Sequence, residues 1–188
     1  MTCSKSDSDS IEKCAALLRQ GAVLILPTDT VYGFSGIIEK TDARIRAIKG
    51  RAETKPFIVL VSEPRDLRFL TDDCVPETLL GFWPGPLTLI VHKKENPAET
   101  VAVRCPGDEW LRAVIRAAGA PVYSTSVNRS GSPVLTKIRD IRAEFEAEVS
   151  LIVDDGDSGS SVPSTIVRLE ERGWSVVRAG AVEVPAYF

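Results

Sequence analysis

The sequence is poor in the side chains that usually carry nucleophilic or metal chemistry. It has one histidine, His92, and four cysteines without any C-x-x-C spacing. A Ser-His-Asp or Cys-His catalytic pair could use only His92, and a zinc site would need other ligands. We expect His92 to lie at a strand end in a structural role. The scattered cysteines indicate buried thiols in a reducing compartment, and we predict no metal ligands.

The chain also lacks long apolar runs and both common phosphate-binding loops. Its longest apolar stretches, such as Ala22–Leu26, hold five or six residues, so we expect no membrane span. Met1–Ser10 is polar and has no apolar stretch, which predicts a disordered tail and excludes a secretory signal. We therefore expect a cytoplasmic protein. Neither G-x-x-x-x-G-K-[ST] nor G-x-G-x-x-G occurs, so side-chain cations would have to hold a bound nucleotide.

The composition is that of an ordinary globular protein: 188 residues, 44% hydrophobic and 26% charged, with a net charge of −3. These values predict a tail over residues 1–10 and a single domain over residues 11–188. Predicted strands alternate irregularly with helices, and several strands are close neighbours in sequence. This favours an α+β fold with a twisted mixed parallel and antiparallel sheet flanked by helices. The negative charge argues against a nucleic-acid footprint spread over the surface.

Two polar clusters follow predicted strands. The strand Ala22–Leu26 leads into Pro27–Gly33, a cluster of hydroxyls with one carboxylate, and the strand Pro121–Tyr123 leads into Ser124–Gly131. Ligand crevices in α/β sheets lie at strand ends. The hydroxyls and the Asn128 amide can donate hydrogen bonds to a carboxylate or a phosphate. These clusters therefore predict a site for a polar ligand.

Five cations lie at predicted ends of strands or helices: Lys49, Arg51, Lys55, Arg104 and Arg178. Arginine binds phosphate and carboxylate oxygens in a bidentate manner, and lysine adds a point charge. A helix that begins at Thr41 or Asp42 and ends near Lys49 would leave Lys49 and Arg51 exposed at its terminus. Together with the hydroxyl clusters, these cations indicate a polar substrate held beside phosphate.

Seven motifs in order make the chain resemble the YrdC-like domain of threonylcarbamoyl-AMP synthases, over about Ile11 to Val182. They are P-T-D-T-V-Y-G at Pro27–Gly33, K-x-R with a following proline at Lys49, Arg51 and Pro56, P-G-P-x-T at Pro84–Thr88, T-V-A-V-R-x-P at Thr100–Pro106, S-x-N-x-S-G at Ser126–Gly131, S-T-I at Ser164–Ile166, and R-x-G at Arg178–Gly180. The resemblance implies the mixed-sheet YrdC/RibB-like fold.

The resemblance also implies a reaction. Such enzymes join L-threonine, bicarbonate and ATP to give L-threonylcarbamoyladenylate and pyrophosphate, with Mg²⁺ on the ATP phosphates. The product feeds downstream tRNA threonylcarbamoyl-transferase machinery, which modifies the adenosine at position 37 of tRNAs that read ANN codons. By resemblance, the L-threonine site comprises Thr30, Arg104, Ser124 and Ser164. The ATP site comprises Lys49, Arg51, Lys55, Thr100, Ser126, Asn128 and Arg178, with Lys49 and Arg51 as the catalytic pair.

The chain departs from the family pattern at two positions. Leu60 stands near the place where some members have a histidine that helps to hold threonine, and Val134 stands near the place of a serine that contacts ATP in others. Each departure removes one contact. The chain also ends at Phe188, so we expect it to lack the additional C-terminal domain of longer members.

Two alternative functions remain open. A YrdC-like fold can serve mainly as a binding module for double-stranded RNA or tRNA. It can also be a related carbamoyl-adenylate-forming domain that acts on carbamoyl phosphate, although such domains usually lie in longer chains with zinc-finger cysteines.

Overall fold

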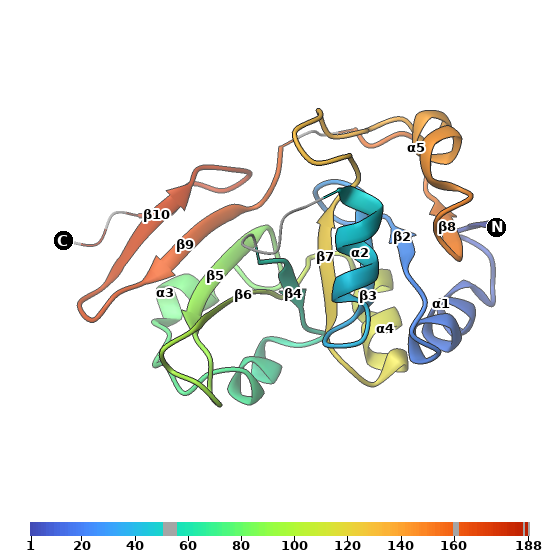
Figure 1. The fold of residues 1–188 in the computed structure, drawn as a ribbon. Helices are drawn as coiled ribbons and strands as arrows, with labels where there is room; N and C mark the ends of the chain where they lie inside the picture. The colour runs from blue at the N-terminus through green and yellow to red at the C-terminus, as the bar shows by residue number, and fades with distance from the viewer. Residues whose placement is uncertain (51–55, 160–161, 186, 188) are drawn as a thin grey trace.

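The computed structural model describes residues 1–50, 56–159, 162–185 and 187 (Figure 1). Arg51 and Lys55, two of the predicted ATP-binding residues, lie outside the described residues. Among the described residues, no helix is both long and apolar enough to cross a membrane.

The strands of the described chain form one mixed sheet in the order β1-β8-β2-β3-β7-β4-β6-β5-β9-β10. Four neighbouring pairs are parallel and five are antiparallel, which confirms the predicted mixed sheet. The strands are β1 (Thr2–Ser4), β2 (Leu24–Leu26), β3 (Gly33–Ile37), β4 (Ile58–Leu60), β5 (Leu87–His92), β6 (Thr100–Arg104), β7 (Val122–Ser126), β8 (Leu151–Asp154), β9 (Thr165–Leu169) and β10 (Trp174–Arg178).

Four of the described helices cover both faces of the β1-β8-β2-β3-β7 half of the sheet, whereas the 3₁₀ helix and the shortest α-helix pack with β5, β6 and β9 in the other half (Figure 1). The helices are α1 (Ser10–Arg19), α2 (Asp42–Lys49), the 3₁₀ helix η1 (Pro64–Phe69), α3 (Glu77–Leu80), α4 (Glu109–Ala118) and α5 (Ile138–Phe145). The start of α2 at Asp42 and its end at Lys49 agree with the sequence prediction. Gly50 follows α2 in the left-handed conformation, with φ 59°, which glycine adopts at little cost.

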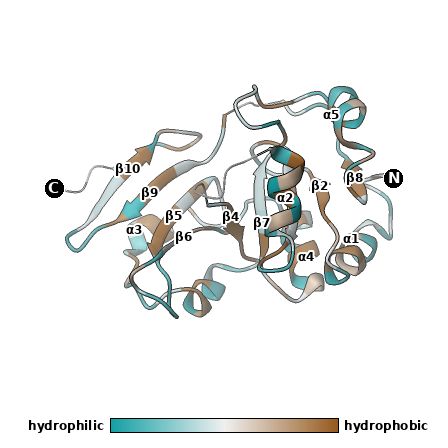
Figure 2. Ribbon diagram, viewed as in Figure 1, coloured by the Kyte–Doolittle hydropathy of each residue, from teal (hydrophilic) through white to brown (hydrophobic). Residues whose placement is uncertain are grey.

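The alternation of side chains along the strands explains the two helical layers. In β2, Leu24 and Leu26 pack with α1 and α4 on one face, whereas Ile25 packs with α2 and α5 on the other. All three are fully buried, because successive side chains of a strand point to opposite faces. Figure 2 shows β2 in brown, as hydrophobic, whereas α5 carries hydrophilic residues in teal.

Strand β3 was not predicted, because its glycines disfavour a strand when judged locally. The reason for them is close packing. A Cβ atom added to Gly36 would lie 2.4 Å from Thr41 Oγ1, and one added to Gly33 would lie 2.6 Å from Ser124 Oγ. Gly33 therefore lets β7 bring Ser124 against the β2–β3 connection.

The predicted disordered tail is wrong in part. Thr2–Ser4 forms β1, which pairs in parallel with β8 at the edge of the sheet. Lys5 then binds the carboxylates of Asp108 and Asp155 at 2.7 and 2.8 Å. The polar composition of this segment hid a strand whose partner is some 150 residues away in the sequence.

Candidate functional site

One cavity of about 400 Å³ gathers most of the predicted site residues. It lies where the β2–β3 connection meets the ends of β6, β7 and β10 and the start of β9. The predicted residues that line it are Thr30, Lys49, Arg104, Ser124, Ser126, Asn128, Ser164 and Arg178. The polar clusters that follow strands in the sequence therefore converge in space, as the strand-end argument predicts.

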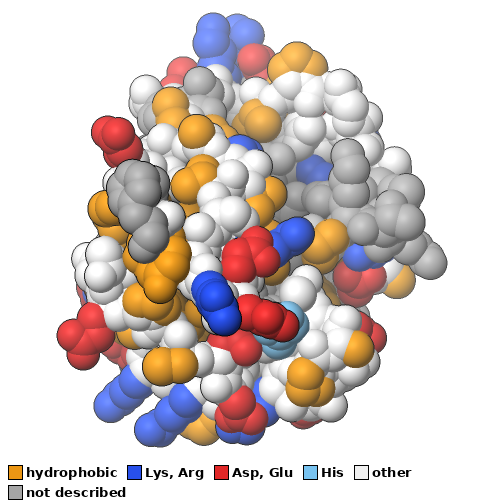
Figure 3. Space-filling view, turned by 90° about the vertical axis from the view of Figure 1, so that its left-hand side faces the viewer, with side chains coloured by type: hydrophobic (Ala, Val, Ile, Leu, Met, Phe, Trp, Pro, Cys, Tyr) orange, Lys and Arg blue, Asp and Glu red, His pale blue; other side chains and the backbone are white. Residues whose placement is uncertain are grey.

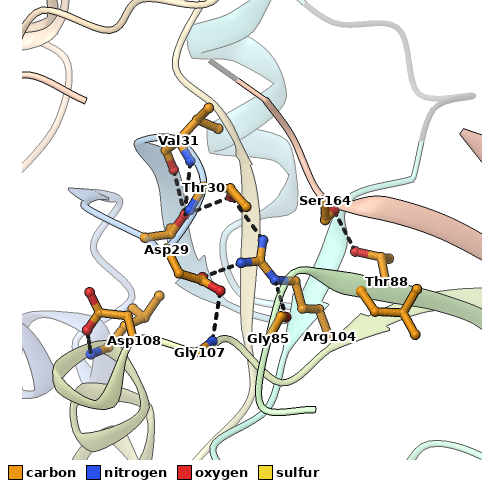
Figure 4. Close-up of polar contacts among 12 residues, drawn as sticks. Asp29, Thr30, Val31, Gly85, Thr88, Arg104, Gly107, Asp108 and Ser164 are labelled. Atoms are coloured by element: carbon orange, nitrogen blue, oxygen red, sulfur yellow. Dashed lines mark hydrogen bonds and ion pairs between the residues drawn. The ribbon is translucent and has the colours of Figure 1, made fainter. Parts of the chain in front are cut away.

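Arg104, the last residue of β6, is 5% exposed and is held by three groups (Figure 4). Its Nε donates to the Gly85 carbonyl at 3.1 Å, and its Nη1 donates to Thr30 Oγ1 at 3.0 Å. Its Nη2 forms an ion pair with the Asp29 carboxylate. A buried guanidinium needs such partners, because an unpaired buried charge is strongly destabilising.

The β2–β3 connection is itself organised by Thr28. The Thr28 hydroxyl donates to the Val31 carbonyl at 2.8 Å and accepts the Thr30 backbone N–H at 3.0 Å. It also lies 3.0 Å from the Thr30 hydroxyl. Short hydroxyl side chains stabilise turns in this way. The turn fixes Thr30 beside Arg104, which explains the two threonines of the motif.

Lys49 corrects a sequence prediction: its side chain is buried, with 3% of the residue exposed, rather than solvated at a helix end. Its ammonium donates to the Ser126 carbonyl at 2.5 Å and to the carbonyl and side-chain oxygens of Asn128, both at 3.0 Å. It also lies 5.3 Å from the centre of the Phe34 ring. Lys49 thus ties the end of α2 to the loop after β7 and shapes the cavity wall.

Asn128 continues this network. Its side-chain oxygen also accepts a hydrogen bond from the Ser126 hydroxyl at 2.8 Å, and its amide nitrogen donates to the carbonyls of Arg129 and Ser132 at 2.9 and 2.7 Å. The S-x-N motif therefore builds a rigid loop as well as lining the cavity.

Arg178, at the end of β10, is held differently. The residue as a whole is exposed, but its guanidinium reaches into the cavity, where Nε and Nη2 donate to the Ser164 carbonyl at 3.2 and 2.6 Å. Burial of the guanidinium, together with the nearby charge of Arg104, lowers the pKa of Arg178. Among the described residues, no carboxylate forms an ion pair with Arg178.

The site is therefore suited to an anion. Arg104, Arg178 and Lys49 bring three positive charges to one cavity, and its described lining contains no acidic residue. Hydroxyls of Thr30, Ser124 and Ser164 stand among them. Ser164 Oγ lies 2.8 Å from Thr88 Oγ1, which holds it in place (Figure 4). This arrangement can bind carboxylate and phosphate groups side by side.

Three other described positions named in the sequence analysis lie in three different surroundings. Thr100 lines a neighbouring cavity of about 420 Å³, which shares Pro56 and Phe57 with the first. Leu60 pairs in register with Arg104 but packs in the core with α4. Val134 does line the first cavity.

Two residues of the site were missed. Asp29 holds Arg104, and Tyr32 holds the loop that follows β8, since its hydroxyl donates to the Gly156 carbonyl at 2.8 Å and accepts the Asp155 N–H at 2.9 Å. Burial raises the pKa of Tyr32, so its hydroxyl stays protonated and able to donate. The sequence could have indicated both, because Asp29 is the single acidic residue and Tyr32 the single aromatic residue of the Pro27–Gly33 motif.

The fold and the cavity define a class of protein: an α+β domain that collects cations and hydroxyls from strand ends to bind anionic ligands. A family model described as "Telomere recombination", that of the Sua5/YciO/YrdC family, matches residues 16–180. The chain belongs to this family.

Curated relatives and solved structures agree with that assignment. The chain is 35% identical to threonylcarbamoyl-AMP synthase of Bacillus subtilis, over 94% of this chain and 55% of the relative. It is 31% identical to that of Pyrococcus abyssi, over 92% and 54%. The chain thus spans about half the length of these two relatives.

Two solved structures share its fold. P. abyssi Sua5 complexed with L-threonine superimposes with a TM-score of 0.82, at 32% identity over 90% of this chain and 54% of that one. Escherichia coli YciO gives a TM-score of 0.84, at 26% identity over 98% and 95%. The predicted YrdC-like fold is therefore confirmed.

Proposed function

We propose that this chain is a threonylcarbamoyl-AMP synthase, which forms L-threonylcarbamoyladenylate and pyrophosphate from L-threonine, bicarbonate and ATP. The observation that carries the proposal is the single cavity in which Arg104, Thr30, Ser124 and Ser164 stand beside Lys49, Ser126, Asn128 and Arg178. One set suits an amino acid and the other suits phosphates. The names of the relatives and the threonine complex of the P. abyssi structure support the same substrates.

The amino-acid end would be built around Arg104. The guanidinium would bind the threonine carboxylate, while the hydroxyls of Thr30, Ser124 and Ser164 would contact its amine and side chain. The threonine amine would attack carbon dioxide or bicarbonate to give N-carboxythreonine, with loss of water in the latter case. In this reaction the nucleophile is the substrate amine, so the residues that line the cavity would act by positioning the substrates.

The phosphate end would receive ATP as its Mg²⁺ complex. A carbamate oxygen would attack the α-phosphorus of ATP, the bond from that phosphorus to the β-phosphate bridging oxygen would break, and pyrophosphate would leave. Arg178 and Lys49 would stabilise the charge on the phosphates, and we propose that Arg51 and Lys55 do so as well. Within the described residues, no group of three or more acidic, histidine or cysteine side chains could hold a metal, so the cation would arrive with the nucleotide.

The product would pass to the downstream tRNA threonylcarbamoyl-transferase machinery, and we place the reaction in the cytoplasm. The assay is pyrophosphate release with ATP and bicarbonate, in the presence of each amino acid in turn. We expect release to depend on threonine. Release that is independent of threonine would contradict the proposal.

The salt dependence of RNA affinity distinguishes the RNA-binding alternative from the enzyme. Binding through phosphate contacts releases counterions, so RNA affinity would fall steeply as salt rises. We expect instead that ATP together with threonine raises the thermal unfolding temperature, because ligands that bind only the folded state stabilise it. Pyrophosphate release with carbamoyl phosphate in place of bicarbonate and threonine would favour the carbamoyl-adenylate alternative.

A further inference from the structure

Asp29 is the only acidic side chain of the Pro27–Gly33 motif, and the proposed reaction gives it no task. It does not line the cavity that Arg104 lines but a separate one of about 310 Å³. Both carboxylate oxygens are engaged: Oδ1 pairs with Arg104 Nη2, and Oδ2 accepts the Gly107 N–H at 2.9 Å (Figure 4). Asp29 therefore lies behind the arginine, away from a ligand in the first cavity.

The contacts of Arg104 show what Asp29 leaves available. A guanidinium has five N–H donors. Nε is used by Gly85, one hydrogen of Nη1 by Thr30 and one of Nη2 by Asp29. Among the described residues, one N–H of each terminal nitrogen has no partner, and each of these N–H groups can donate to a carboxylate oxygen.

We infer that Asp29 is a positioning residue for the amino-acid substrate: it orients Arg104 so that the two remaining donors receive the substrate carboxylate. This inference rests on the proposed function. Asp29 joins the β2–β3 connection to the segment after β6, so the guanidinium is fixed before the substrate arrives. A preorganised donor binds more tightly, because less side-chain freedom is lost on binding.

A competing role would have Asp29 occupy Arg104 and exclude the substrate carboxylate. The structure opposes this, since Asp29 lines the second cavity rather than the one lined by Arg104, and the Gly107 N–H holds its Oδ2 there. The two roles predict opposite signs. Removal of a positioning charge weakens threonine binding, whereas removal of a competitor strengthens it.

The experiment compares Asp29→Asn with the wild type in steady-state pyrophosphate release, varying threonine and ATP separately. Asparagine has one carbonyl oxygen, so its NH₂ group must face either the Gly107 N–H or the guanidinium. We expect the threonine KM to rise about 10- to 100-fold, with kcat and the ATP KM within about 2-fold of wild type. Asp29→Glu, which keeps the charge, should give a smaller rise.

Gly107→Ala tests the same contact independently of the carboxylate. A Cβ atom there would lie 3.1 Å from Asp29 Oδ2, so the alanine displaces Asp29 slightly. We expect a rise in the threonine KM of about 2- to 10-fold. This variant carries the test should Asp29→Asn fail to fold. The matched control is Asp140→Asn, which breaks an exposed ion pair with Arg139. Its kcat and its KM values for threonine and ATP should equal those of the wild type.

The outcomes separate the two proposals. Wild-type protein without threonine-dependent release refutes the proposed function, and the Asp29 role with it. An active wild type, combined with folded Asp29→Asn and Gly107→Ala variants whose threonine KM is unchanged or lower, overturns the Asp29 role alone. A rise in the ATP KM equal to that for threonine also overturns it, because a general loosening of the site would act on both substrates.

Discussion

The two arginines of the cavity are held by very different parts of the molecule. Arg104 belongs to a platform formed by the Pro27–Gly33 loop and the ends of β6 and β7, where it contacts a carboxylate, a hydroxyl and a carbonyl. Arg178 belongs to the β9–β10 hairpin, and its described hydrogen bonds all go to Ser164. Arg104 is therefore held by several segments of the fold, whereas Arg178 lies on a hairpin at the edge of the sheet.

The surroundings of the hairpin reinforce this difference. Strand β10 pairs only with β9 among the described strands, and Val176 and Val177 are 48% and 51% exposed. Figure 3 views the molecule from the hairpin side and shows hydrophobic side chains at the surface among charged ones. Residues with few buried contacts contribute little to global stability. Substitutions in the platform should therefore affect folding and activity together, whereas those in the hairpin should affect activity alone.

The largest effect is expected for Arg104→Ala. It removes the proposed partner of the threonine carboxylate and leaves the partly buried Asp29 without its ion pair. Two charge-assisted hydrogen bonds contribute about 3 kcal/mol or more, so kcat/KM should fall by about 100-fold or more. The free energy of unfolding should fall by about 1–3 kcal/mol, as measured by urea unfolding. Arg104→Lys should not restore activity, since it lacks the bidentate geometry.

Lys49→Met should act mainly on stability. It leaves the backbone carbonyls of Ser126 and Asn128 without the buried ammonium donor, whereas the Asn128 side-chain oxygen keeps the Ser126 hydroxyl. The expected cost is about 2–4 kcal/mol in the free energy of unfolding. Activity should also fall, because the loop that carries Asn128 loosens. The control is Lys40→Met at an exposed lysine, which should be neutral. Unchanged unfolding of Lys49→Met would show that Lys49 does not support the platform.

Arg178→Ala should separate activity from stability. We expect the ATP KM to rise or kcat to fall by about 10- to 150-fold, the range for one charge-assisted contact. Because burial and Arg104 lower the pKa of Arg178, folding disfavours its charged form, and this opposes the stability gained from its bonds to Ser164. The unfolding free energy should therefore change by less than about 1 kcal/mol. A loss as large as that of Lys49→Met would remove the contrast between platform and hairpin.

The smallest effect is expected in the labelling of cysteine thiols in the wild-type protein. The labelling rate of a cysteine reports how tightly its surroundings are packed, and no substitution is needed. Cys105 follows Arg104, is buried, and has its pKa raised by burial to about 12. The thiolate is the reactive form, so Cys105 should stay unmodified at pH 8, like the buried Cys14, whose pKa is also about 12. Exposed Cys74 should react. Mass spectrometry after a short labelling pulse can tell these sites apart, and labelling of Cys105 as fast as Cys74 would contradict the packed platform.

The sequence by itself determined the mixed sheet, the bounds of α2 and the polar clusters at strand ends, because hydrophobic periodicity and turn chemistry are local properties. The clusters Pro27–Gly33 and Ser124–Gly131 accordingly meet at one cavity. The identities of the cations were also visible, since charge and motif spacing do not depend on the fold.

Only the tertiary structure decided how each cation is held. Asp29 and Arg104 are 75 positions apart in the sequence, and Lys49 and Asn128 are 79 positions apart. No local pattern could therefore reveal that Arg104 forms an ion pair or that the Lys49 ammonium is buried against the loop after β7. Strand β3 needed glycines for contacts with Ser124 and Thr41, and β1 needed the edge of β8. Burial and pairing depend on which distant segments come together, and packing settles that against local preference.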